Sequence, residues 1–461
     1  MLFPAAADWL TQEPDAQVFL TSAAITIAVG GLLVAAGQRE HVILSRKAGF
    51  LLTTTAYISA SLFGALPLFL SNQNIPYVDA LFETVSGLTT TGASVLSGLD
   101  TMPAGILLWR AILNWFGGIG VVAIALILMP FLDVGGMQIL RSQSAGGSDH
   151  NLQGAQRIGI AIFTVYAFLT AMCFIAYWSA GMSRFDALLH AMSTLSTGGF
   201  TTHDASFAYF DAPAIYWIAV IFMFLAACPY AMFLRMAQGN ILAPFRDTQV
   251  LTMFFIAAGV STALIIAFVG MHSFDGAKSI REIVFNVTSI LTTTGFSCAD
   301  FNLWGPFAGM VFVSLMFVGG CTGSAAGGLK IMRYEVMVRV MALQMRRLLD
   351  PHAVVPLRYH RRPIMTTAVL SITVLAFLYL ASALLIAGLL SLIGVDPLSA
   401  FTGAAAAVGN VGPGLGPVIG PAGDYGSLPD AAKMILALGM VMGRLEFFSV
   451  LVLFSASFWR S

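Results

Sequence analysis

Four stretches of sequence decide how this chain folds. They read TVSGLTTTGAS at residues 84–94, AMSTLSTGGFT at 191–201, VTSILTTTGFS at 287–297 and AAAAVGNVGPG at 404–414. Aligned, they place one glycine of each stretch in register, and these glycines recur at intervals of 107, 96 and 117 residues: Gly92, Gly199, Gly295 and Gly412. This period is much longer than a solenoid unit, so it predicts four copies of a helix–loop–helix module around an axis.

The composition places these repeats in a membrane. Of 461 residues, 58% are hydrophobic and 10% are charged, whereas a soluble domain carries about 25% charged residues. Lys and Arg together number 22, as do Asp and Glu, so the basic excess of a nucleic-acid binder is missing. Apolar runs such as DAPAIYWIAVIFMFLAACPYAMFL, which starts at Asp211, do not alternate as the strands of a membrane β-barrel do. The sequence therefore predicts an all-α polytopic membrane protein.

Each of the four stretches lies between two long apolar segments. The expected pairs of long helices are 48–70 with 105–131, 157–181 with 213–236, 249–271 with 306–345, and 363–394 with 430–457. Between them lie segments too short to cross a bilayer, at 77–88, 184–195, 279–291 and 396–408, which predict re-entrant helices. One further helix is expected near 17–36, so the chain divides into an N-terminal unit at 1–47 and four repeats at 48–140, 141–248, 249–362 and 363–461.

The distribution of charge predicts the orientation in the membrane. If the loop at 37–47 is cytoplasmic, then the arginine-rich stretches at 333–347 and 358–362 lie on the same side. The opposite side carries few basic residues and many aspartates, which satisfies the positive-inside rule. An acidic outer face also concentrates cations at its surface. We therefore expect a multi-pass protein of the cytoplasmic membrane, in contact with lipid, with its C-terminus in the cytoplasm.

The four Gly- and Thr-rich loops have a physical use at membrane depth. A short helix that ends inside the membrane points its carbonyl groups, with about −0.5 charge, at the loop that follows. Non-helical backbone is tolerated there only where it is buried or lines a watery path. Four converging loops make a ring of carbonyl oxygens, which replaces the hydration shell of a monovalent cation. The alternative is a helix-packing motif of small residues, which four copies in register make much less favourable.

At this point the sequence resembles a known family, the Trk/Ktr/HKT superfamily of potassium transporters, and within it the bacterial TrkH-type subunits. The resemblance covers nearly the whole chain and is carried by these motifs: SGLTTTGAS (86–94), STGGFTTHDAS (196–206), TTTGF (292–296), GNVGPGLG (409–416), NWFGGIG (114–120), GGCTGSAAGGLK (319–330) and GRLEFF (443–448). It implies four helix–pore-loop–helix repeats around a central pore, built like a K⁺ channel but from one chain. It also implies a homodimer in which each protomer has its own pore. Family members usually have two helices before the first repeat, whereas only one is expected here.

The resemblance assigns a K⁺ selectivity filter to twelve positions: Thr90, Thr91 and Gly92; Thr197, Gly198 and Gly199; Thr293, Thr294 and Gly295; and Asn410, Val411 and Gly412. Family members that favour Na⁺ tend to carry Ser at the first aligned glycine. Glycine at all four positions therefore predicts a preference for K⁺ and Rb⁺ over Na⁺. The diverged fourth loop predicts weaker selectivity than a filter with four identical loops has.

A second glycine-rich segment interrupts the last long helix of the third repeat. Residues 319–328 hold five glycines in ten positions: Gly319, Gly320, Gly323, Gly327 and Gly328. Because each glycine costs a helix about 1 kcal/mol, we expect the helix to break here. A packing seam of small residues is one interpretation, and a phosphate-binding loop is a weaker one. The family resemblance implies an intramembrane loop that obstructs the pore beneath the filter and acts as its gate.

Arg444 is the second candidate gate residue. It follows Asp430 by 14 residues, which is roughly 20 Å along a helix, and a charge at that depth is functional by default. Glu446 is two residues away and does not face it on a helix. One interpretation makes Arg444 a structural residue held by carbonyl groups. The family resemblance makes it a positive barrier in the pore.

These patterns predict K⁺ uptake through a gated pore and not an enzyme, with K⁺ as the transported ion and no cofactor in this chain. The alternative function is a symporter that couples K⁺ to H⁺ or Na⁺ by alternating access, although such transporters usually show two-fold repeats. The basic runs at 333–347 and 358–362 satisfy the topology rule on their own. The resemblance adds that they form part of the docking surface for a cytoplasmic nucleotide-binding regulatory subunit (TrkA-like).

Overall fold

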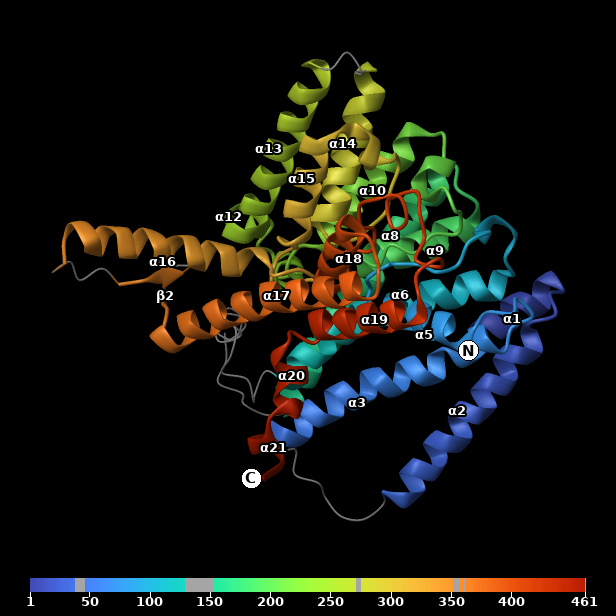
Figure 1. Cartoon of the computed structure of the whole chain (residues 1–461). Helices are drawn as coiled ribbons and strands as arrows, with labels where there is room; N and C mark the ends of the chain where they lie inside the picture. Colours follow the sequence, from blue (N-terminus) through green and yellow to red (C-terminus); the bar gives the residue numbers. More distant parts are fainter. Residues whose placement is uncertain (38–45, 129–151, 271–274, 352–355, 360–361, 461) are drawn as a thin grey trace.

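The chain folds into a bundle of helices, seen here in a computed structural model (Figure 1). The structure describes residues 1–37, 46–128, 152–270, 275–351, 356–359 and 362–460. Within these residues the only sheet is one antiparallel pair, β1 (Arg358–Tyr359) with β2 (Arg362–Pro363). The expected boundary between the first two repeats, at residues 140 and 141, lies outside the described residues. The all-α fold class is confirmed.

The N-terminal unit contains the expected helix and one more. Helix α2 (Ala16–Ala36) is the helix predicted near 17–36, and α1 (Leu2–Thr11) precedes it. With 10 residues, α1 is too short to span a bilayer, which takes about 20. Its Asp8 carboxylate accepts a hydrogen bond from the backbone amide of Gly105, in the first turn of α6. Helix N-termini leave such amides unpaired, so α1 caps a helix of the first repeat.

Each repeat consists of a long helix, a short helix that ends in a loop, and a second long helix that is often broken. The first repeat contains α3 (Arg46–Gly64), α4 (Leu66–Phe69), α5 (Tyr77–Leu88), η1 (Leu99–Thr101) and α6 (Ala104–Leu128). The second contains α8 (Leu152–Ser179), α9 (Arg184–Ser196), η2 (Ser206–Tyr209), α10 (Pro213–Ala226) and α11 (Tyr230–Ala237). The second repeat ends with the short α12 (Ala243–Arg246), and the third contains α13 (Thr248–Gly270), α14 (Gly276–Leu291), η3 (Phe301–Trp304), α15 (Pro306–Met316) and α16 (Ile331–Leu349). The fourth contains α17 (Thr366–Leu392), α18 (Pro397–Gly409), α19 (Asp430–Arg444), α20 (Phe448–Leu451), η4 (Val452–Phe454) and α21 (Ala456–Arg460).

Three of the second long helices break, and only one of these breaks was predicted. The expected break in the third repeat is confirmed, because α15 ends at Met316 and α16 begins at Ile331. The continuous helix predicted at 213–236 is wrong: α10 and α11 meet at 93°, and Pro229 at the break has no amide hydrogen for a helical bond. The continuous helix predicted at 430–457 is also wrong, because Glu446 and Phe447 adopt left-handed backbone angles.

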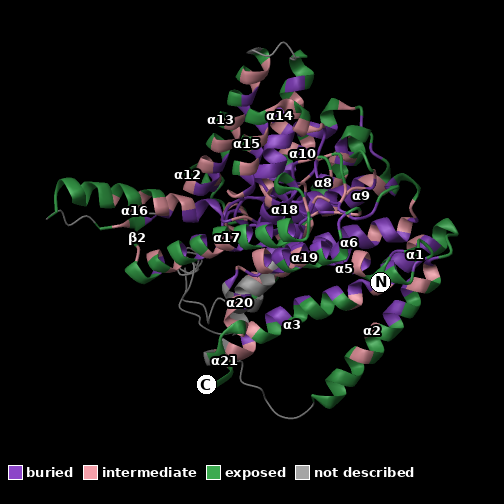
Figure 2. Ribbon diagram, viewed as in Figure 1, coloured by how far each residue is buried: buried purple, intermediate pink, exposed green. Residues whose placement is uncertain are grey.

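The long helices face lipid and the short ones form the core. Five described helices are long and apolar enough to cross a membrane, and the bent pair α10–α11 makes up to six. Only 17 to 39% of each of the five spans is buried inside the protein. The remaining surface of these helices is largely apolar, and Phe255 and Phe377 are examples of its exposed side chains. Such surface is tolerated where lipid covers it. Figure 2 shows the buried residues concentrated around the short helices at the centre.

Candidate functional site

The four short helices end in the same backbone motif. After each, an amide hydrogen-bonds to a carbonyl oxygen five residues earlier, at 2.8–2.9 Å, in the pairs Thr91–Ser86, Gly198–Ser193, Thr294–Ser289 and Val411–Ala406. In every case the amide of the preceding residue donates to the carbonyl three residues earlier, for example Thr90 to Gly87 at 3.0 Å. This is the Schellman pattern of helix termination. The resemblance between the loops therefore extends from their sequence to their hydrogen bonds.

The residue that turns each loop is strained in three of the four copies. A Schellman motif needs a left-handed residue, usually glycine, and here it is Thr90 (φ 50°), Thr197 (φ 53°), Thr293 (φ 56°) or Asn410 (φ 53°). Asparagine adopts left-handed angles more readily than other non-glycine residues, whereas these angles are unfavourable for β-branched threonine. Backbone strain of this kind persists only where the surroundings enforce it, and it clusters at functional sites. The family resemblance assigned these four residues to the filter, whereas the sequence indicated the aligned glycine as the turning residue.

The four loops close into a ring. A Cβ added to the aligned glycine of one loop would come closer than 3.0 Å to a carbonyl oxygen of the next loop. The pairs follow the chain and return to its start: Gly92 meets the carbonyl of Gly198, Gly199 that of Thr294, Gly295 that of Val411, and Gly412 that of Thr91. All four glycines have positive φ, between 76° and 102°. The structure thus brings all twelve predicted filter residues together, with neighbouring backbones so close that only glycine fits.

The fourth loop differs from the others through its asparagine. The Asn410 side-chain amide donates to the Thr91 hydroxyl at 3.0 Å and to the Met440 carbonyl at 2.9 Å. In the first and third loops, threonine hydroxyls two residues apart pair instead, for example Thr89 with Thr91 at 2.8 Å. Asn410 therefore links the fourth loop to the first, and the ring has only approximate four-fold symmetry.

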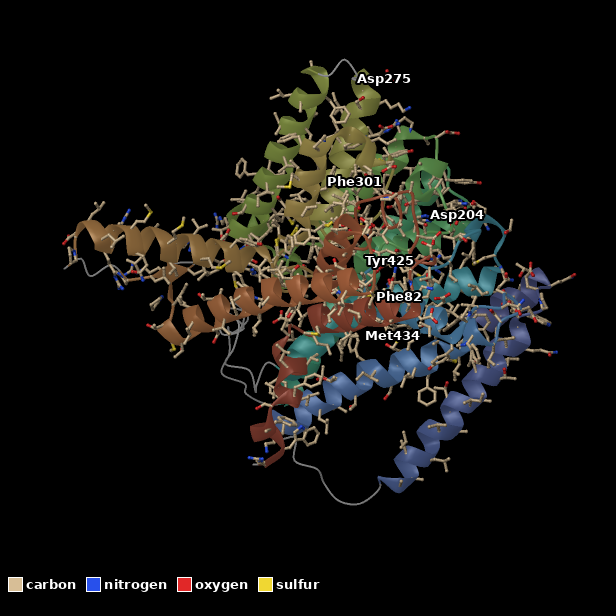
Figure 3. The ribbon with its side chains drawn as sticks, in the orientation of Figure 1. Phe82, Asp204, Asp275, Phe301, Tyr425 and Met434 are labelled. Carbon is tan, nitrogen blue, oxygen red and sulfur yellow. The ribbon has the colours of Figure 1, made fainter. Side chains whose placement is uncertain are left out.

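One cavity opens onto the ring, and we call it the outer cavity after the side on which the sequence predicts it to lie. It has a volume of about 310 Å³, and all four aligned glycines line it, together with Asp204 and Asp424. Tyr425 closes one side, where its hydroxyl donates to the Gly412 carbonyl at 2.7 Å and its ring lies 5.5 Å from that of Phe82 (Figure 3). A hydrated cation in this cavity would lie in a polar chamber bordered by the four aligned glycines of the ring.

The rim of this cavity joins the first two loops by a charged contact. His203 hydrogen-bonds to the Asp100 carboxylate, and it stacks on Tyr209 with ring centroids 3.4 Å apart. The hydrogen bond from His203 holds the pKa of Asp100 below its usual value. Asp204 accepts from the amides of Gly98 and Leu99 at 3.0 and 3.1 Å. Two acidic side chains, Asp100 and Asp204, are therefore tied into the junction between the first two loops.

The glycine-rich segment of the third repeat lies directly beneath the ring. The Gly327 amide donates to the Thr293 hydroxyl at 2.7 Å, and the Gly328 amide donates to the Gly409 carbonyl at 2.9 Å. The two ends of the segment cross so closely that a Cβ on Gly319 would strike the Gly327 carbonyl. The predicted gate residues are therefore adjacent to the predicted filter residues, and the Gly327–Thr293 hydrogen bond connects the two groups.

Neighbouring helices hold the same segment at points that the sequence did not indicate. The Cys321 amide donates to the Ala227 carbonyl, and the Tyr230 amide donates to the Gly323 carbonyl, both at 3.0 Å. Ala227 and Tyr230 lie on either side of the break between α10 and α11. Because helix ends leave backbone groups unpaired, the Ala227 carbonyl and the Tyr230 amide are free to bind the segment. From α13, the Gln249 side chain accepts from the Thr322 amide at 2.9 Å. Pro229 was the only sequence signal for these contacts.

Arg444 is buried against the glycine-rich segment. One guanidinium nitrogen donates to the Ala325 carbonyl at 2.8 Å and another to the Gly117 carbonyl of α6 at 3.1 Å. The side chain is 4% exposed, and the Nε atom has no hydrogen-bond partner among the described residues. A positive charge held by carbonyl groups therefore lies beside the glycine-rich segment, as the structural interpretation of Arg444 predicts, and its role as a barrier in the pore stays a prediction.

Glu446 forms a second polar contact below the segment. Its carboxylate lies 2.9 Å from a guanidinium nitrogen of Arg333 and 4.0 Å from the Lys330 ammonium. It pairs with these residues and not with Arg444, as the i,i+2 spacing predicted. The four side chains line a space of about 20 Å³, close to the minimum that holds one water.

The chain is similar in sequence to known transport proteins. The sequence profile of the TrkH family, described as "Cation transport protein", matches residues 15–461. The "Trk system potassium uptake protein TrkI" of Halomonas elongata is 39% identical over 97% of this chain and 91% of its own. The "Trk system potassium uptake protein TrkH" of Salmonella typhimurium is 35% identical over 100% and 96%.

A solved structure has the same fold. The crystal structure of "the Potassium Transporter TrkH from Vibrio parahaemolyticus" superposes with a TM-score of 0.91 at 33% identity, and the match covers 100% of this chain and 96% of that one. The relatives are transport proteins, and this chain is not an enzyme. On sequence and fold together, the chain belongs to the TrkH family of cation transport proteins.

Proposed function

We propose that this chain forms a K⁺-selective pore for potassium uptake. The observation that carries the proposal is the closed ring in which each loop glycine abuts a carbonyl of the next loop. Rings of backbone carbonyls are the usual filter for K⁺. The related proteins from Halomonas elongata and Salmonella typhimurium are named for potassium uptake, which supports the choice of ion.

In the proposed pathway, K⁺ loses its water at the loops. The ion enters the outer cavity and meets carbonyl groups of the twelve residues assigned to the filter. The C-terminal ends of α5, α9, α14 and α18 point at these loops, and each adds about −0.5 charge. The short loop backbones are anchored by Schellman hydrogen bonds, so their carbonyls are held ready to replace the hydration shell.

Below the filter, the segment at 319–328 and Arg444 act as the gate. The segment occupies the exit of the ring through its bonds to Thr293 and Gly409. The Arg444 charge beside it repels a passing cation. Opening requires the segment to leave these partners, so the arrangement described here is a closed state.

The protein is proposed to act in the bacterial inner membrane as a homodimer with one pore in each protomer. The arginines of α16 then face the cytoplasm together with the C-terminus, in keeping with the positive-inside rule. Figure 1 shows α16 projecting from the bundle, where a cytoplasmic subunit can reach it. We assign this side to a TrkA-like nucleotide-binding regulator.

Charge reversal on α16 tests the regulator surface. Arg346 and Arg347 are exposed, whereas Arg361 lies outside the described residues and the side chain of Arg362 is not described. We expect replacement of all four by Glu to abolish co-purification with the regulator while basal Rb⁺ flux persists. Lys278→Glu, on the exposed opposite side, is the control and should leave co-purification intact. Loss of membrane insertion in the fourfold variant would show that the arginines serve topology alone.

Ion competition in cells tests the proposed function. Expression in a bacterium that lacks its own K⁺ uptake should restore growth at low K⁺ and produce Rb⁺ uptake. Excess K⁺ should suppress this uptake, and equal Na⁺ should suppress it much less. Equal suppression by both ions would refute a K⁺-selective filter.

A further inference from the structure

A fully buried ion pair lies behind the filter loops on the outer side. Glu83 of α5 and Arg110 of α6 meet at 2.8 Å, and their side chains are 0% and 2% exposed. The sequence indicated neither residue as part of a site. Burying two charges costs several kcal/mol each, and an apolar pair of the same volume is often as stable. Stability alone is therefore a weak reason for this pair.

The contacts of the pair lead to two filter loops. The Glu83 carboxylate accepts from the Val95 amide at 2.9 Å and from the Ser94 hydroxyl at 3.0 Å, both in the extended segment that continues the first loop. The Arg110 guanidinium donates to the Thr201 carbonyl of the second loop at 2.8 Å and lies 4.3 Å from the centre of the Phe200 ring. The two charges thus bind the segments that leave the first and second loops to one point.

The same contacts continue to the fourth loop. The Ser94 carbonyl accepts from the Tyr425 amide at 2.8 Å, and the Tyr425 hydroxyl donates to the Gly412 carbonyl at 2.7 Å. Arg110 also donates to the Ser94 hydroxyl at 3.2 Å. Gly412 is one of the aligned glycines, so a chain of hydrogen bonds leads from the ion pair to the ring itself.

The pairing also sets the charge beside the outer cavity. Arg110 lines this cavity, where an unpaired guanidinium would repel cations. Glu83 neutralises it at close range, and its own charge is satisfied by Ser94 and Val95. Arginine presents several donors in a fixed plane, which lets it hold Glu83 and the Thr201 carbonyl together.

We propose that Glu83 and Arg110 are positioning residues for ion specificity: they hold the first, second and fourth loops at the separation that favours K⁺ over Na⁺. This inference rests on the proposed function, because it takes the ring to be the filter. It assigns the pair no contact with the ion. The pair acts through the segments at 94–95 and 200–201 and through Tyr425.

A double variant removes the pair without leaving a buried charge. For Glu83→Gln/Arg110→Met, we expect the preference for Rb⁺ over Na⁺ to fall roughly tenfold, equivalent to about 1.4 kcal/mol between the ions. The readout is Na⁺ competition against Rb⁺ uptake in proteoliposomes, per correctly assembled protein. The ratio of the two ions is the diagnostic quantity, because a general loss of stability lowers both fluxes together.

The chain offers a matched control pair. Lys433 of α19 binds Asp79 of α5, also on the outer side and with the lysine buried, but no described contact leads from this pair to a filter loop. Asp79→Asn/Lys433→Met should lower stability and leave the ion ratio unchanged. An equal change in the ratio for both double variants would overturn a specific role for Glu83 and Arg110.

Two further variants keep every outcome informative. If the double variant does not assemble, Ser94→Ala carries the test, because it removes contacts to both side chains and leaves the charges paired. A parental ion ratio in Ser94→Ala, or in an assembled double variant, would overturn the proposal. Gly92→Ser is measured in parallel. If the preference for Rb⁺ over Na⁺ changes in Gly92→Ser but stays parental in the Glu83/Arg110 and Ser94 variants, only the positioning role is refuted. Parental ratios in all of them refute the filter assignment itself.

Discussion

Removing the Arg444 charge is expected to raise Rb⁺ flux even without a regulatory partner. A cation at ~6 Å from the guanidinium meets repulsion of about 3 kcal/mol at an effective dielectric of about 20. Water and carbonyl groups reduce this value, so we expect an increase of up to about a hundredfold. Arg444→Ala also removes the hydrogen bond to Ala325, which loosens the segment beneath the filter. The measurement is Rb⁺ uptake per correctly assembled protein.

A deletion within 323–328 should also raise Rb⁺ flux, because it loosens the segment beneath the filter while the Arg444 charge stays in place. It removes the backbone that bonds to Thr293 and Gly409. Because both changes act on one barrier, their combined effect should be smaller than the sum of the two in free energy. If Arg444 serves only to hold carbonyl groups and helices together, Arg444→Ala will instead lower the yield of folded protein and the flux. Flux at or below the parent in both single variants would refute the gate and leave the filter untouched.

Replacing Gly92 by Ser is expected to admit Na⁺. Gly92 has a φ of 80°, and a Cβ there would strike the Gly198 carbonyl oxygen. The serine must therefore push this carbonyl away, which changes the cage that replaces the hydration shell of K⁺. We expect Na⁺ to compete with Rb⁺ roughly tenfold more strongly, since a difference of about 1.4 kcal/mol between the ions suffices.

Gly98→Ser is the matched control for this substitution. Gly98 lies on the same segment, with a φ of 76°, and a Cβ there meets only the Thr101 hydroxyl at 3.9 Å. Both variants carry the cost of a left-handed serine, but only Gly92→Ser disturbs the ring. Unchanged Na⁺ competition in Gly92→Ser would count against the register of the four loops. An equal change in both variants would attribute the effect to backbone strain.

The sequence predicted those features that follow from repetition and from hydrophobic length. Four short apolar segments with aligned glycines predicted the short helices α5, α9, α14 and α18 and the loops after them. The five glycines at 319–328 predicted the break between α15 and α16, because a helix does not tolerate so many. Each of these signals is local, so one sequence is enough to find it.

The missed features depend on contacts between distant segments. Nothing near Glu83 indicates that Arg110 lies against it, since the two are 27 residues apart and on different helices. Glu446 meets Arg333 across 113 residues, and a left-handed backbone at Glu446 makes this possible. The left-handed threonines of the loops contradict local preference, as expected where the surrounding structure enforces strain. Pro229 alone offered a local signal, for the break between α10 and α11.

The most direct test is Rb⁺ uptake into proteoliposomes that contain the purified protein alone, with and without a proton gradient. A channel-like pore predicts uptake that follows only the Rb⁺ gradient and the membrane voltage, that is larger in Arg444→Ala, and that K⁺ suppresses more than Na⁺ does. The coupled alternative predicts that uptake vanishes when the proton or Na⁺ gradient is removed. Strict dependence on either gradient would contradict a pore formed by the four loops.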